Sequence, residues 1–110
     1  MAFIQGKYQE ALDIAKEAIK MDSNNADAYL CAGNANMSFE KYDEAIKYYE
    51  RATECEPENG DRYFHLGYAL ATNSQSAEAI ATFAKADEMG CSPEVTGQLY
   101  KILGMLCFDL

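Results

Sequence analysis

The chain has 110 residues, 49% of them apolar and 25% charged, which is the composition of one folded domain in water. Nine basic and eighteen acidic side chains give a net charge of −9, which argues against binding to nucleic acid or to anionic membranes. No apolar run approaches the roughly 18 residues of a membrane helix, and the first residues lack the pattern of a signal peptide. We therefore expect a cytoplasmic protein.

The sequence matches itself at an offset of 34 residues. The segment 29–33, Tyr-x-x-Ala-Gly, recurs as Tyr-x-x-Leu-Gly in 63–67 and, 37 residues further on, in 100–104. Apolar residues recur at intervals of three and four, as they do on one face of a helix, whereas the alternation of a strand is absent. A fixed period in this range is typical of stacked pairs of helices.

Helix stop signals divide this single domain into four segments, which are residues 1–25, 26–59, 60–93 and 94–110. The first segment has only the pattern of the second helix of a repeat. Each of the two middle segments predicts a complete helix pair. The last predicts the first helix of a further repeat or a capping helix. A chain of this kind is expected to be a piece of a longer array or a short protein with unusual ends.

Turns within and between the pairs are marked by polar residues, glycine and proline. Residues 39–41 and 72–74 are the expected turns inside the two complete pairs. Ser92 and Pro93 form a typical helix start, because the serine hydroxyl can cap the helix and proline suits its first position.

Small residues recur where two helices are expected to approach closely. Gly33 and Gly67 lie on the first helix of their pairs, and glycine inside a helix costs about 1 kcal/mol relative to alanine. The large rings expected on the other side of these contacts are Tyr29, Tyr49, Tyr63 and Phe83. We expect each ring to fill the space that a glycine leaves opposite it.

These positions resemble the tetratricopeptide repeat, whose signature runs aromatic, Leu-Gly and aromatic on the first helix, then Ala, aromatic, Ala and Pro on the second. The first complete repeat matches at Tyr29, Gly33, Ala45, Tyr49, Ala52 and Pro57. It departs at Ala32, where leucine is usual, and at Asn36, where an aromatic residue closes the helix. In the second repeat, Cys91 replaces the terminal proline. The resemblance implies an all-α, right-handed α-solenoid of antiparallel helix hairpins with about six helices.

The resemblance also implies a non-catalytic protein–protein interaction module, a scaffold or adaptor that binds a peptide or helix of a partner in a concave groove. The first helices of the repeats would form this groove. The expected groove residues are Asp27, Leu30, Cys31, Asn34, Met37, Asp61, Phe64, His65, Tyr68 and Thr72. Their aspartates argue against the subtype that captures the carboxylate tail of heat-shock chaperones. The acidic composition favours a neutral or basic partner.

Two alternatives concern assembly and secretion. The segment 99–108 is apolar almost all round, so Leu103, Leu106 and Phe108 are candidates for self-association, which would build a larger assembly or a homo-oligomer. The family also includes the cytoplasmic chaperones of type III secretion, which are built from about three such repeats.

Catalysis, metal binding and cofactor binding are not expected. Asp61 and His65 are spaced as a carboxylate and the imidazole that it orients, with Cys31 as a conceivable nucleophile, but an open solenoid wall excludes little water. The four cysteines contain no Cys-x-x-Cys pair, and His65 is the only histidine, so a zinc site is improbable. Reduced, packing cysteines are the simpler interpretation.

Overall fold

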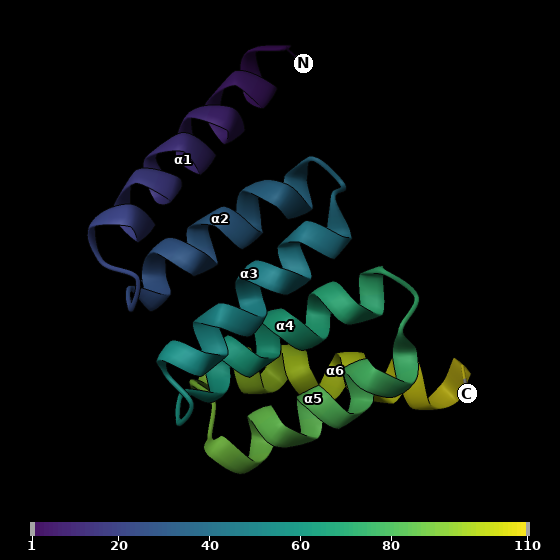
Figure 1. The fold of residues 1–110 in the computed structure, drawn as a ribbon. Helices are drawn as coiled ribbons and strands as arrows, with labels where there is room; N and C mark the ends of the chain where they lie inside the picture. The colour runs from purple at the N-terminus through teal and green to yellow at the C-terminus, as the bar shows by residue number, and fades with distance from the viewer. Residues whose placement is uncertain (1, 110) are drawn as a thin grey trace. The chain divides into compact units, whose positions relative to one another are not determined.

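The computed structural model describes the backbone of residues 2–109 and the side chains of residues 6–105. This part of the chain forms six helices and no strand (Figure 1). The helices are α1 (Ala2–Met21), α2 (Ala26–Ser38), α3 (Tyr42–Cys55), α4 (Gly60–Thr72), α5 (Ser76–Met89) and α6 (Pro93–Asp109). They group into two compact units, Met1–Cys55 and Glu56–Leu110. Within the described residues, no helix combines the length and the apolar character that crossing a membrane requires.

The first unit consists of the α2–α3 hairpin with α1 packed along α2 (Figure 1). Small and branched side chains form its core, where Leu12 and Ala15 of α1 meet Ala32 and Ala35 of α2. Two half-buried rings, Phe39 and Tyr48, pack against this cluster. Most of these core residues are alanines, so α1 and α2 meet largely through small side chains.

The second unit consists of the α4–α5 hairpin with α6 packed against both helices. Its core contains larger side chains than the first unit, namely Phe64, Leu70, Phe83 and Leu99. Phe83 and Leu99 are fully buried, and the rings of Phe64 and Phe83 lie 5.7 Å apart, centroid to centroid. Burial of these side chains is the main stabilising contribution that we identify in the second unit.

The two hairpins close by the same backbone geometry. Glu40 and Ser74, 34 residues apart, both have left-handed backbone angles, with φ of 61° and 64°. The amide that follows each of them donates a 2.9 Å hydrogen bond to a carbonyl five residues earlier, and this bond ends the first helix of the pair. The second turn covers residues 73–75, because α4 continues through Thr72, so it lies one residue later than the sequence predicts.

Two of the four expected rings, Tyr49 and Phe83, fill the space beside the glycines. A Cβ atom added at Gly33 would lie 2.5 Å from Cε1 of Tyr49, and one added at Gly67 would lie 2.7 Å from Cδ1 of Phe83. Real Cβ atoms essentially never approach other atoms so closely. Glycine at these two positions therefore permits the close packing of each hairpin, as its spacing in the sequence indicates.

Candidate functional site

The expected groove residues of the first unit form a stripe along α2, which we call the α2 stripe. Asp27, Cys31 and Asn34 are exposed on it, and Leu30 and Met37 are half-buried. The side-chain oxygen of Asn34 accepts a hydrogen bond from the Tyr49 hydroxyl. This bond holds the Asn34 amide in a defined orientation at the surface.

The equivalent stripe of the second unit, the α4 stripe, runs along α4. Tyr68, with 48% of its surface exposed, and Thr72 face solvent, whereas Asp61 and His65 are half-buried. Phe64 differs from the expectation that it offers an exposed anchor. Only 5% of it is exposed, because its ring packs against Phe83 of α5. Phe64 therefore supports the stripe from beneath, and its ring contacts Tyr68 at a centroid distance of 6.4 Å.

Asp61 has a structural partner within the second unit. One oxygen of its carboxylate accepts a 3.0 Å hydrogen bond from the backbone N–H of Ser92, the residue before α6. This bond ties the start of α4 to the start of α6. The carboxylate that the sequence pairs with His65 is thus engaged by the backbone.

Burial lowers the pKa of His65 from its ordinary value, because the charged imidazolium is poorly solvated there. The positive charge of Arg62 lowers it further, and the negative charge of Asp61 opposes both effects. His65 is therefore neutral in the folded protein at pH 7. A neutral imidazole can both donate and accept a hydrogen bond at the α4 stripe.

We expect the free energy of unfolding to decrease as the pH falls from 7.5 through 6.5. The unfolded chain takes up a proton on His65 near its ordinary pKa of 6.5, while the folded protein resists protonation until lower pH. Urea unfolding at pH values between 7.5 and 5.5 measures this effect. The His65→Gln variant should show a weaker pH dependence, and identical slopes for the two proteins would contradict the expectation.

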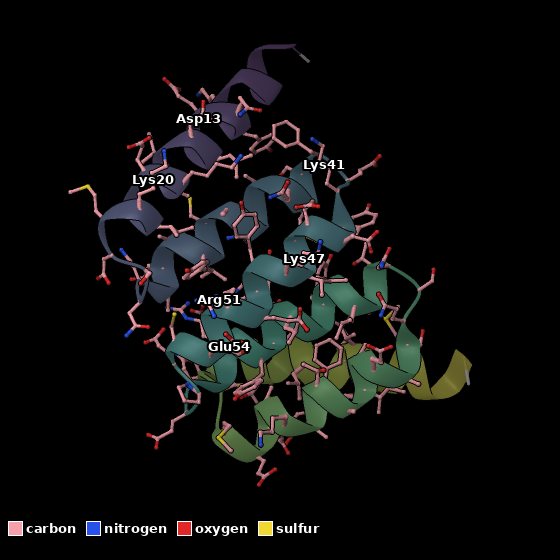
Figure 2. The ribbon with its side chains drawn as sticks, viewed as in Figure 1. Asp13, Lys20, Lys41, Lys47, Arg51 and Glu54 are labelled. Atoms are coloured by element: carbon pink, nitrogen blue, oxygen red, sulfur yellow. The ribbon has the colours of Figure 1, made fainter. Side chains whose placement is uncertain are left out.

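A pocket that the sequence did not predict lies in the first unit, between α1, α2 and α3. Its volume is about 360 Å³, and we call it the α1–α3 pocket. Its lining residues are Leu12, Lys16, Asn36, Lys41, Glu44 and Tyr48. Figure 2 shows Lys41 at the turn between α2 and α3, with Lys47 farther along α3. The departure from the repeat signature at Asn36 was the available signal, since a short polar residue stands there in place of a ring.

The residues predicted for self-association lie on α6. Leu103 is half-buried, and the side chains of Leu106 and Phe108 lie outside the described residues. Two neighbours that the prediction omitted, Tyr100 and Met105, are 54% and 61% exposed. The Tyr100 hydroxyl donates a 2.6 Å hydrogen bond to Asp87 of α5, which raises the pKa of this phenol.

The alternative catalytic set is divided between the two units, with Cys31 in the first and His65 in the second. Cys31, Cys55 and Cys91 carry free thiols, and burial raises the pKa of Cys91, which makes its reactive thiolate scarcer. Among the described side chains, no three His, Cys, Asp or Glu residues gather as ligands of a metal ion would.

Sequence comparisons place this architecture in a known family. A profile described as tetratricopeptide repeat matches residues 2–63, and another with the same description matches residues 48–81. The chain belongs to the tetratricopeptide repeat family. A comparison of this tetratricopeptide repeat protein with curated protein sequences found no match.

Solved structures show the same fold. The type III secretion chaperone SycD of Yersinia enterocolitica, solved with a peptide of the translocator YopD, has a TM-score of 0.88 and 20% identity over 97% of this chain and 85% of its own. The TPR2B domain of yeast Sti1, solved in a complex with pHsp70, has a TM-score of 0.84 and 19% identity over 98% and 89%. YrrB, described as a TPR protein with an unusual peptide-binding site, has a TM-score of 0.77 and 31% identity over 92% and 50%. The predicted fold class, an all-α array of tetratricopeptide helix hairpins, is confirmed.

Proposed function

We propose that this protein is a non-catalytic interaction module that binds a peptide or helix of a partner protein, with the α2 stripe of the first unit and the α4 stripe of the second unit each as a candidate surface. Membership of the tetratricopeptide repeat family is the observation that carries this proposal. Structures of the same fold have been solved with a bound peptide, in SycD, and in a complex with pHsp70, in the TPR2B domain.

The chemistry of the two stripes supports this function. Tyr68 offers a half-exposed ring that Phe64 holds in place, and such supported aromatic residues are frequent anchors at interfaces. Asn34 and the neutral His65 offer hydrogen-bonding groups on the same two helices. Because Asp27 and Asp61 lie at the start of each stripe, we expect a neutral or basic partner.

A capture experiment with a matched pair of variants tests the proposal. The tagged full chain, the Tyr68→Glu variant and an Ala81→Glu control are incubated with lysate of the source cell. Ala81 is exposed on α5, so the control adds the same charge away from both stripes. We expect a partner that the wild type and the control retain and that Tyr68→Glu loses at least tenfold. Phe64→Glu is unsuitable, because a buried charge would unfold the second unit.

Equal retention of every partner by all three proteins would contradict binding at the α4 stripe. Circular dichroism of each variant confirms that the helices remain. A fluorescence titration with synthetic peptides from the captured partner then locates the bound segment and measures the partner's charge preference directly.

The second candidate function is self-association through α6, and the exposure of Tyr100 and Met105 favours it. Light scattering would then show a molar mass that rises with protein concentration, and the Met105→Lys variant would remove this rise.

A secretion chaperone is the third candidate, favoured by the similarity to SycD. It would be supported if the captured partner were a secreted translocator protein.

A further inference from the structure

The α1–α3 pocket is lined by a short polar residue of α2, Asn36, at a position where the second repeat has a leucine. Asn36 and Leu70 are equivalent at the offset of 34, and both are buried, with 4% and 5% of their surface exposed. Ala32 likewise stands at the position that the larger Leu66 occupies in the second repeat. A polar amide therefore lines the α1–α3 pocket at a position where the second repeat has an apolar side chain.

Positive charge dominates this pocket although the protein as a whole is acidic. Lys16 and Lys41 line it from α1 and from the turn before α3. Among the described residues, no carboxylate lies within ion-pair distance of either ammonium group. Asn36 donates one amide hydrogen to the carbonyl of Ala32 over 3.0 Å, which leaves the second hydrogen of that nitrogen for a ligand. These groups are donors suited to a carboxylate.

The remaining lining residues restrict the ligand further. Leu12 and Tyr48 offer apolar surface on which an aliphatic stem can lie. Glu44 contributes a carboxylate. Its negative charge would repel a second carboxylate of the ligand, but its oxygens would accept hydrogen bonds from peptide N–H groups. The volume of about 360 Å³ lies at the small end of ligand pockets and suits one side chain with its flanking peptide groups.

We propose that the α1–α3 pocket binds the side-chain carboxylate of a glutamate residue in a partner polypeptide. The carboxylate lies between Lys16 and Lys41, its stem packs on Leu12 and Tyr48, and its backbone N–H groups face Glu44. Because the wider surface is acidic, the pocket selects one acidic side chain within an otherwise neutral or basic segment.

This site is independent of the stripes described above. Asn36 follows Asn34 by two positions on α2, which places the two side chains on nearly opposite sides of the helix. The two proposals can therefore fail separately. Absence of binding at the pocket would not contradict binding at the stripes, and the Tyr68→Glu variant leaves the pocket intact.

Titration of the ¹⁵N-labelled full chain with N-acetyl-glutamate N-methylamide, followed by amide chemical shifts, tests the proposal. We expect saturable shifts at Asn36, Lys41 and Tyr48. The glutamine analogue, which has the same shape without the charge, should bind at least about tenfold more weakly, because hydrogen bonds to a charged group are lost. Butyrate serves as a free carboxylate without peptide groups. Weaker binding of butyrate supports a polypeptide ligand, and equal binding contradicts that part of the proposal.

Three variants of lining residues and one control variant locate the site. Lys16→Gln and Lys41→Gln should each weaken binding about tenfold. Lys47→Gln is the control, because Lys47 lies on α3 but does not line the pocket, and it should bind as the wild type does. Asn36→Leu places the residue of the second repeat in the pocket lining and should abolish the saturable shifts. Equal binding of the glutamate and glutamine probes, or unchanged binding by both lysine variants, would overturn the proposal even if Asn36→Leu failed to fold.

Discussion

Replacing Phe83 by alanine is expected to lower the free energy of unfolding by about 3–5 kcal/mol. The side chain is fully buried, its ring lies against Phe64, and it fills the space that Gly67 leaves open. Removing it loses the burial of an aromatic ring and leaves a cavity that the helices of the second unit cannot easily close. Urea unfolding followed by circular dichroism measures the change.

Tyr68→Ala is the matched control for this substitution, since it removes a ring of similar size from a position that is 48% exposed. We expect it to cost less than about 1 kcal/mol, because little buried surface is lost. A cost for Phe83→Ala no larger than that of the control would show that the Phe64–Phe83 contact does not stabilise the protein.

Replacing Gly67 by alanine is expected to lower the free energy of unfolding by about 1–3 kcal/mol, although alanine is the better helix former. The added Cβ atom would lie 2.7 Å from two carbon atoms of the Phe83 ring, so the ring or the helix must move. Because Phe83 is fully buried, its ring cannot simply turn out into solvent to make room. Thermal and urea unfolding of the variant measure this cost.

Gly104→Ala distinguishes this steric cost from a general effect of glycine. Gly104 holds the equivalent position on α6, where an added Cβ atom meets nothing within 4 Å. Alanine there should raise the free energy of unfolding by up to about 1 kcal/mol through helix propensity alone.

The double variant tests the contact itself. Gly67→Ala and Phe83→Ala should lower the free energy of unfolding less together than the sum of their separate effects, because they share one contact. Additive costs would contradict the proposed contact.

The helices and their internal contacts follow from local spacing. The 34-residue period, the polar turns and the glycines opposite large rings predict six helices in pairs, and Gly33 with Tyr49 and Gly67 with Phe83 form those contacts. Such features depend on residues a few turns apart within one hairpin, where helix geometry determines which side chains share a face. The stripe residues Asn34 and Tyr68, which the structure places at the surface, were expected instead from the resemblance to the tetratricopeptide repeat.

Other features depend on contacts between helices, and only the tertiary structure decided them. The helical pattern places Phe64 beside the exposed face, but packing of α5 buries its ring against Phe83. Asp61 is held by the backbone of Ser92, 31 residues later, which no local spacing predicts. The lining of the α1–α3 pocket combines residues of α1, α2 and α3 with one residue of the turn between α2 and α3. Sequence by itself determined which residues are helical and which faces are apolar, because those depend on local geometry. Whether a residue at the edge of an apolar helix face is buried, and what shape a pocket between helices has, depend on the volumes of side chains on neighbouring helices. Both are therefore decided only when the helices pack.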